Sequence, residues 1–202
     1  RDFALRAVEE SQAVDVHPAS IIAEPCRRNT AVAISTAAFF LKERNPLMLV
    51  LPTDHWIGDA RAFQQSVEEA ASVAAHSNQV TILGRPPSSP ETQYGYIRAR
   101  RAGEDMHLDA FIEKPDAFQA EALFHVPDIF WNTGIFVCRA QNFLDLLFLH
   151  APDIFEGCKN AVAAGGDTHK GVFYPQEAAY EALVPVSVDY AVMEKLREAR
   201  VV

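Results

Sequence analysis

The chain has 202 residues and a net charge of −9, with 49% hydrophobic and 22% charged residues. This balance is typical of a globular protein that is long enough to bury a sizeable core. The acidic balance excludes a general binder of nucleic acid polymers, which needs a surplus of basic residues. A mononucleotide needs only a few well-placed cations and stays compatible with this charge. No apolar run reaches the length of a membrane span, so no membrane partner is expected.

Cys26, Cys138 and Cys158 lie far apart and lack the spacing of a metal site. An odd number of scattered cysteines favours free thiols, and we expect a cytoplasmic protein. The chain begins with Arg1 and shows no signal peptide, so we expect an internal piece of a longer protein.

The first half of the chain predicts alternating helices and strands joined by short connections. The expected elements are a helix over 3–14, a strand over 20–23, a helix over 31–44, a strand over 47–51, a helix over 60–76 and a strand over 80–84. Asn29 or Thr30 is the expected N-cap of the second helix, and Asp59 leads the third. This alternation predicts a doubly wound α/β fold.

The second half predicts a hairpin followed mainly by helices. The expected elements are paired strands over 94–101 and 107–113, a helix over 117–124, a strand over 135–138 entered through a turn at 131–134, helices over 140–150, 152–164 and 176–183, an extended segment over 186–189, a helix over 190–197 and a strand starting at 201.

The apolar run over 47–51 predicts a strand buried on both faces, which ends at Pro52 and is followed by Asp54. Functional groups of parallel sheets gather where strands end at their carboxyl edge. Asp54 is therefore a candidate metal ligand. The alternative is that Asp54 caps the helix that follows.

Four other stretches carry polar groups that the fold does not require, and each also has a structural explanation. Residues 24–30 offer backbone N–H groups to an anion or a base, or are an ordinary capped helix start. Residues 92–97 contain a glycine that would let a ligand approach the backbone; the alternative is that the glycine marks a β-bulge or turn. Residues 111–115 place an acid and a base at a strand end; the alternative is that the two form an ordinary surface ion pair. Residues 131–134 hold an amide before a glycine turn.

Taken together, these stretches resemble the sugar-nucleotide pyrophosphorylases, and within them the mannose-1-phosphate guanylyltransferases, including the type fused to a phosphomannose isomerase. The matching stretches are Glu24-Pro25, Arg28-Asn29-Thr30-Ala31, Leu51-Pro52-Thr53-Asp54-His55, Tyr94-Gly95-Tyr96-Ile97, Phe111-Ile112-Glu113-Lys114-Pro115, residues 131–136 and residues 188–195.

The resemblance implies a Rossmann-like doubly wound α/β fold with a mixed sheet, in which residues 1–202 form a single nucleotidyltransferase domain truncated at both ends. It also implies the Mg²⁺-dependent joining of GTP and mannose 1-phosphate into GDP-mannose and pyrophosphate. The oligomeric state stays open, and a homo-oligomer is compatible with the sequence. The implied roles are Mg²⁺ binding and catalysis by Asp54, nucleotide contacts by Glu24, Pro25, Arg28, Asn29 and Thr30, sugar contacts by Gly95, Glu113 and Asn132, and a catalytic contact with the sugar phosphate by Lys114.

The chain also departs from the family pattern. The family's glycine-rich loop, with the N-terminal strand before it, and its second metal-binding aspartate have no counterpart here. Arg27, Val32 and Gln93 replace the Gly, Pro and Gly that are usual in the family. We therefore expect the 202 residues alone to be inactive. The alternatives are a pyrophosphorylase for another hexose phosphate and a degenerate binding or regulatory module.

Overall fold

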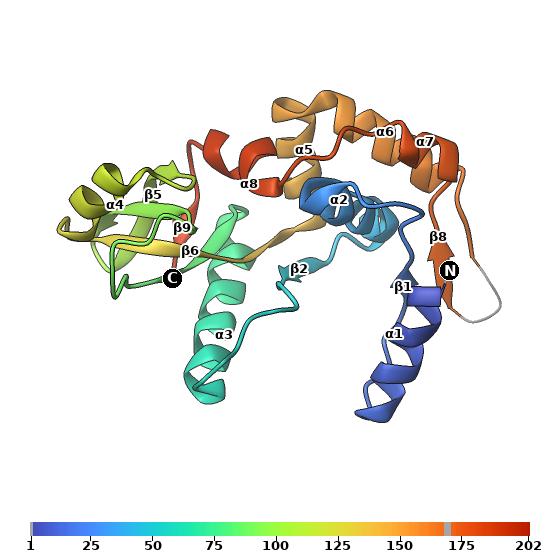
Figure 1. The fold of residues 1–202 in the computed structure, drawn as a ribbon, viewed down its shortest axis with the longest axis horizontal. Coiled ribbons are helices and arrows are strands. Elements are labelled where there is room, and N and C mark those ends of the chain that lie inside the picture. The colour runs from blue at the N-terminus through green and yellow to red at the C-terminus, as the bar shows by residue number, and fades with distance from the viewer. Residues whose placement is uncertain (1, 168–170) are drawn as a thin grey trace.

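The computed structural model describes residues 2–167 and 171–202, which Figure 1 shows as a ribbon. The first elements are α1 (Asp2–Ala13), β1 (Ile21–Ile22), α2 (Asn29–Leu41), the 3-10 helix η1 (Lys42–Arg44), β2 (Leu47–Val50), α3 (Ala60–Ser77) and β3 (Thr81–Arg85). The middle elements are β4 (Tyr96–Ala102), β5 (Asp105–Ile112), α4 (Ala117–Phe124), β6 (Ile129–Arg139), α5 (Ala140–His150) and α6 (Pro152–Ala163). The last are β7 (Gly166–Asp167), β8 (Val172–Tyr174), α7 (Glu177–Glu181), α8 (Val188–Ala191), η2 (Met193–Lys195) and β9 (Arg200–Val201).

The described strands form two sheets. The larger has the order β2-β6-β3-β9-β5-β4, with β4 also pairing with β6, and the smaller has the order β1-β8-β7. Strand β6 runs antiparallel to β2 and β3, whereas β9 runs parallel to β3. The expected mixed α/β sheet is confirmed, although β1 lies in the smaller sheet and β6 separates β2 from β3.

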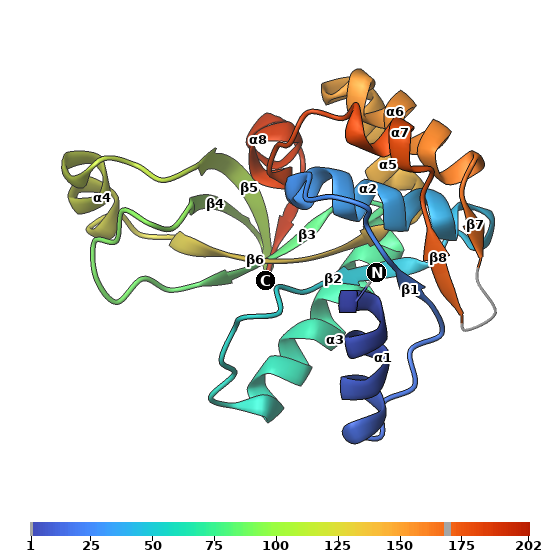
Figure 2. The ribbon, with the colours of Figure 1, turned by 45° about the vertical axis from the view of Figure 1, so that its right-hand side comes forward.

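Helices cover both faces of the larger sheet. Helix α3 carries Phe63, Val67, Ala70 and Ala74 at helical spacing, and this face packs on Leu83 and its neighbours in β3 and β6. Helices α2, α5, α6 and α8 pack together on the other face. Figures 1 and 2 show α3 on one side of the sheet and this group on the other.

The prediction that residues 47–51 are buried on both faces is wrong. Strand β2 pairs with β6 on one side and has no other strand partner among the residues that the structure describes. Leu49 and Leu51 are accordingly 38% and 48% exposed. A long apolar run therefore marks an edge strand here, with open backbone groups along one side.

The prediction of a turn at residues 131–134 is also wrong, because β6 continues through them. Gly134 has a φ of +69°, and the pairing of β6 with β3 shifts register between Ile82 and Gly84. The hydroxyl of Thr133 donates to the carbonyl of Leu83 at 2.6 Å. Strand β6 is paired on both sides, and this pairing overrides the local preference for a turn. The strand therefore continues, with a shift in register where the turn was predicted.

The prediction of an extended segment over 186–189 followed by a helix over 190–197 is wrong as well. Helix α8 begins two residues earlier, after Ser187, whose hydroxyl accepts from the N–H of Tyr190. Val192, fully buried and with φ −131°, ends α8 before η2 begins. The local sequence pattern predicts one continuous helix here, but the burial of Val192 in the core interrupts it.

Asp59, and not Asp54, caps helix α3. The carboxylate of Asp59 accepts from the N–H groups of Arg61 and Ala62, which confirms it as the cap of α3 and leaves Asp54 without that role. The predicted cap of α2 is wrong. Arg28 occupies the cap position, and its side chain makes no capping hydrogen bond. The Thr30 hydroxyl accepts from the N–H of the distant Val188 instead.

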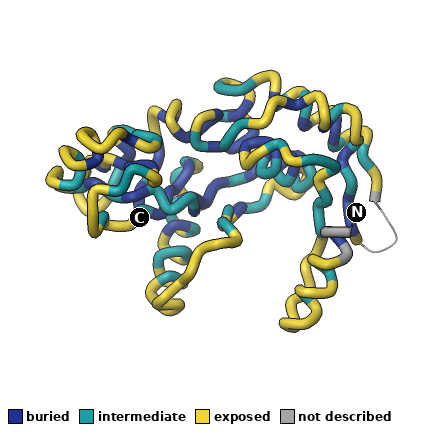
Figure 3. The backbone as a smooth tube through the Cα atoms, in the orientation of Figure 1, coloured by how far each residue is buried: buried dark blue, intermediate teal, exposed yellow. Residues whose placement is uncertain are grey.

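Burial is concentrated where the sheets meet the helices, while α1 and the far end of α3 are largely exposed, as Figure 3 shows. None of the helices in the described parts of the chain is both long and apolar enough to cross a membrane. All three cysteines are free, as predicted.

Candidate functional site

A polar cluster forms around Asn132 in the middle of β6. Its Nδ2 donates to Oδ1 of Asp189 at 3.0 Å, and its Oδ1 accepts from the N–H of Gly134 at 3.0 Å. The backbone N–H of Asn132 donates to the carbonyl of Gly95 at 2.7 Å. These bonds fix the orientation of the amide and leave the second hydrogen of Nδ2 for another acceptor.

Gly95, just before β4, and Glu113, just after β5, complete the cluster. A Cβ atom at Gly95 would lie 2.7 Å from Oε2 of Glu113, so only glycine lets this carboxylate approach so closely. The Glu113 side chain is 6% exposed. Next to it, Nζ of Lys114 lies 3.4 Å from Oε1 of Glu113, and the lysine side chain is 54% exposed.

Burial shapes the electrostatics of the two carboxyl groups. The pKa of Glu113 is raised by burial and then by Asp189, against the lowering effect of Lys114. The pKa of Asp189 is raised by burial, while the hydrogen bond from Asn132 and the charge of Lys114 lower it. Two carboxyl groups that share one nearby cation are suited to accept hydrogen bonds from hydroxyl groups, and the exposed Lys114 is suited to an anion.

Asp189→Asn is expected to stabilise the fold at neutral pH. Because folding raises the pKa of Asp189, its contribution to stability is full below the pKa of the unfolded chain and is lost as the pH rises through the folded pKa. Asn at this position still accepts from Asn132 and carries no buried charge. The melting temperature should rise at pH 7, by about 2–4 °C per kcal/mol regained, and the gain should shrink towards pH 4. Differential scanning calorimetry at both pH values, with the exposed Asp153→Asn as control, measures this; an equal gain at both would contradict it.

A cavity of about 490 Å³ adjoins this cluster and reaches the loop after β2. Its lining comes from that loop, α3, β3, the segment before β4, β6 and Val202. It includes Asp54, His55, Phe63, Leu83, Arg85, Tyr94, Trp131, Asn132 and Ile135. Asn132 thus belongs to both the cavity and the cluster. The exposed carboxylate of Asp54 forms no hydrogen bond or ion pair with any residue that the structure describes, so it is available to a ligand.

Trp131 and Arg85 form part of the cavity wall. The guanidinium of Arg85 lies 5.6 Å from the centroid of the Trp131 ring, and the ring of Tyr94 meets the same indole edge-on at 5.1 Å. The buried Nε1 of Trp131 has no partner among the described residues. The wall therefore offers a ligand one guanidinium cation and aromatic surface.

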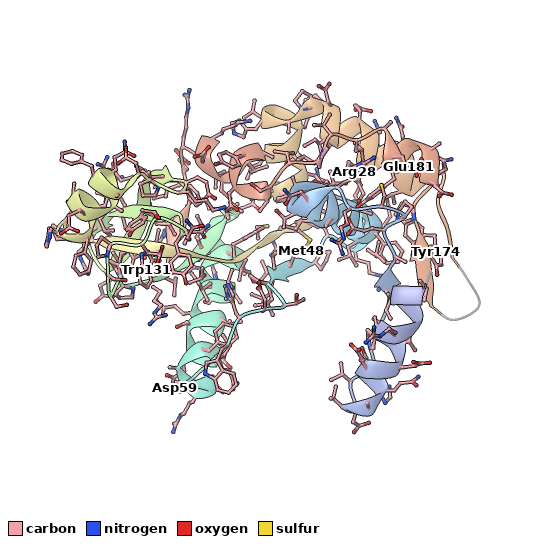
Figure 4. All side chains as sticks on the ribbon, viewed as in Figure 1. Arg28, Met48, Asp59, Trp131, Tyr174 and Glu181 are labelled. Carbon is pink, nitrogen blue, oxygen red and sulfur yellow. The ribbon has the colours of Figure 1, made fainter. Side chains whose placement is uncertain are left out.

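The predicted nucleotide residues lie in another region of the fold. The carboxylate of Glu24 accepts a short hydrogen bond from the hydroxyl of Tyr180, and Arg28 donates to the carbonyl of Glu181. Burial and the neighbouring Glu24 raise the pKa of Tyr180, which keeps the hydroxyl protonated as the donor. Figure 4 shows Arg28 beside Glu181 and Trp131 at the other end of the molecule. The base contacts assigned to this segment stay a prediction.

Pro25 and Asn29 belong to the same segment as Glu24 and Arg28. With Glu24, Pro25 lines a separate cavity of about 760 Å³ beside α1 and β1. The side chain of Asn29 accepts from the next N–H along the chain, that of Thr30, at 2.8 Å.

The start of α8 connects the two predicted sets of site residues. Val188 donates its N–H to the Thr30 hydroxyl at 2.9 Å, and the next residue, Asp189, accepts from Asn132. A single turn of helix therefore contacts both the segment assigned to the nucleotide and the segment assigned to the sugar.

Sequence reasoning did not single out Asp189, Arg85 or Trp131 as site residues. Asp189 lies 57 residues from Asn132 in sequence, and only the packing of α8 against β6 brings the two together. Asp189 did fall within a stretch that matches the family, which was the one available signal. Nothing in the local sequence around Arg85 or Trp131 indicated that the two side chains line the same cavity.

The chain is similar to several known proteins. The sequence profile of the nucleotidyl transferase family matches residues 3–174. A mannose-1-phosphate guanylyltransferase of Escherichia coli K12 is 42% identical over 91% of this chain, and the xanthan biosynthesis protein XanB of Xanthomonas campestris is 39% identical over 97% of it. The chain spans about two-fifths of the length of these curated relatives, 40% and 42% respectively.

Two solved structures share the fold. A Helicobacter pylori structure described as mannose-6-phosphate isomerase is 28% identical, with a TM-score of 0.88 over 98% of this chain and 77% of that one. A Thermus thermophilus structure described as mannose-1-phosphate geranyltransferase is 30% identical, with a TM-score of 0.79 over 98% of this chain and 63% of that one. The resemblance first seen in the motifs is therefore confirmed at the level of the family.

Proposed function

Because the chain belongs to the nucleotidyl transferase family, we propose that it is the core of an enzyme that joins GTP and mannose 1-phosphate into GDP-mannose and pyrophosphate. The observation that supports this most is the convergence of Gly95, Glu113, Lys114 and Asn132 on one cluster beside the Asp54 cavity. These residues come from three separate stretches of the sequence, yet together they offer what a phosphorylated sugar requires. The name of the E. coli relative supports the same choice of substrates.

The proposed reaction needs positioning more than a protein nucleophile. A phosphate oxygen of mannose 1-phosphate attacks the α-phosphorus of GTP, the new P–O bond forms, and pyrophosphate leaves with the electrons of the broken bond. Both reactants are anions, so cations must hold them together and in line. Lys114 supplies a point charge to the sugar phosphate, while Glu113 and Asn132 orient the sugar through its hydroxyl groups.

Asp54 is the residue that we assign to Mg²⁺. Among the described residues no three His, Cys, Asp or Glu side chains are grouped to hold a metal. A single carboxylate still fits, because Mg²⁺ is commonly held by one or two carboxylates together with substrate phosphates. The free, exposed carboxylate of Asp54 on the cavity wall meets that requirement. When bound, the ion would neutralise phosphate charge.

The free thiols favour a reducing compartment, and we propose that the reaction takes place in the cytoplasm. The direct test is to mix the complete gene product with GTP, mannose 1-phosphate and Mg²⁺ and to follow pyrophosphate release. Glucose 1-phosphate and ATP serve as competing substrates. Release with another pair only, or none at all, would overturn the proposal in favour of another pyrophosphorylase or a binding module.

Lys114→Ala is expected to weaken the binding of mannose 1-phosphate, and so to raise its KM, about ten- to a hundred-fold. The reason is that one charge-assisted phosphate contact is worth roughly 1.5–3 kcal/mol. The KM for GTP should change little. Steady-state kinetics on the complete gene product measure both constants. Lys159→Ala is the matched control, since Lys159 also pairs with a neighbouring carboxylate and its side chain is 50% exposed. If only the KM for GTP rises, Lys114 binds the nucleotide and not the sugar phosphate.

A further inference from the structure

A second cavity, of about 660 Å³, lies at the opposite end of β3 from the Asp54 cavity. Val80, just before β3, lines it, whereas Leu83 and Gly84 near the other end of the strand line the Asp54 cavity. Its walls come from one side of α5 and from the segments 78–80 and 195–198. The volume is within the range of small-molecule sites, and none of the residues assigned to the proposed reaction lines this cavity.

Cationic groups gather on one side of this cavity, although the chain as a whole is acidic. The pKa of His150 is lowered by burial and by the charges of Lys195 and Arg197, so both cations act on the same imidazole. Nζ of Lys195 donates to the carbonyl of His150 at 3.1 Å, which leaves further N–H donors free. Arg197 forms no ion pair within the described part of the chain.

The one carboxylate on the cavity wall is that of Glu198, which accepts from Nε2 of Gln79 at 3.3 Å. The lining also contains Asn142, whose buried Oδ1 has no partner among the described residues. A buried carbonyl oxygen of this kind needs a hydrogen-bond donor. Leu146 and Leu149 of α5 add apolar surface, and Leu149 is 69% exposed.

We propose that this cavity binds a hydroxylated organic anion. The negative charge of the ligand meets Lys195 and Arg197, a hydroxyl group donates to Oδ1 of Asn142, and its carbon skeleton covers Leu146 and Leu149. Charge complementarity selects this occupant over an apolar one, because burying two cations under apolar surface is unfavourable. The site is separate from the proposed reaction and does not depend on it.

Citrate and tricarballylate test the proposal sharply, because they differ only in the hydroxyl group of citrate. The complete gene product is labelled with ¹³C-histidine, and His150→Gln assigns the His150 signal. Saturating citrate is expected to raise the pKa of His150, since a bound anion offsets the neighbouring cations. Tricarballylate should bind about 2- to 10-fold more weakly, as expected for the loss of one hydrogen bond.

Variants separate specific binding from general charge screening. Arg197→Ala should abolish the citrate-induced rise, whereas Arg44→Ala should leave it intact, because Arg44 is exposed and its side chain has no hydrogen-bond or ion-pair partner among the described residues. Asn142→Ala should remove the difference between the two acids. Lys114→Ala should leave citrate binding unchanged, which separates this site from the sugar-phosphate cluster. The proposal is overturned if citrate gives no saturable rise, if sodium chloride at equal ionic strength reproduces it, or if Arg197→Ala retains it.

Discussion

Asp54→Asn in the complete gene product is expected to lower GDP-mannose formation by more than about 100-fold. Removing a metal ligand forfeits several kcal/mol of charge stabilisation, and about 3 kcal/mol already corresponds to that factor. The carboxylate is exposed and forms no hydrogen bond or ion pair with a described residue, so the free energy of unfolding should change by less than about 0.5 kcal/mol. The variant should therefore be folded but inactive.

Pyrophosphate release over a range of Mg²⁺ concentrations measures the loss, and thermal melting shows whether the fold is intact. Asp59→Asn is the matched control, because it removes a carboxylate nearby on the same loop while asparagine still caps α3. It should keep nearly full activity. Turnover of Asp54→Asn within a few-fold of the parent would show that Asp54 holds no metal.

The structure confirms the sequence predictions that depend on short-range interactions. Asp59 caps α3 with bonds to residues two and three positions ahead, and the hairpin of β4 and β5 closes through a short turn. The capping box at Asp116 likewise starts α4 where the pattern placed a helix. In each case the deciding contacts lie within a few residues, so the local sequence contains the information needed to predict them.

The predictions that failed depend on partners that are distant in sequence. Whether the run over 47–51 is central or at an edge depends on which strands flank it, and β6, its one described neighbour, lies more than 80 residues further on. Val192 breaks a helix because it is buried under other elements. The family resemblance named most of the sugar cluster in advance, but the bond from Asn132 to Asp189 requires the folded packing of β6 and α8.

The open edges of β1 and β2 lead to the second large expected effect. Each of these strands has a hydrogen-bonded neighbour on one side only within residues 2–167 and 171–202. Leu49 and Leu51 add exposed apolar side chains next to the open edge of β2. Unpaired polar groups that become buried cost about 1–3 kcal/mol each, against a typical domain stability of roughly 5–15 kcal/mol. Such edges favour pairing with another chain.

We therefore expect a protein made of residues 1–202 alone to self-associate, to bind GTP poorly and to form no GDP-mannose. The glycine-rich loop that opens the resembled family, and that would wrap the triphosphate, has no match within these residues. Light scattering after size exclusion gives the solution mass, and pyrophosphate release gives the activity, with the complete gene product as control. A soluble monomer of residues 1–202 that turns over GTP and mannose 1-phosphate would show that the loop is dispensable and that the positioning mechanism proposed for this family member is wrong.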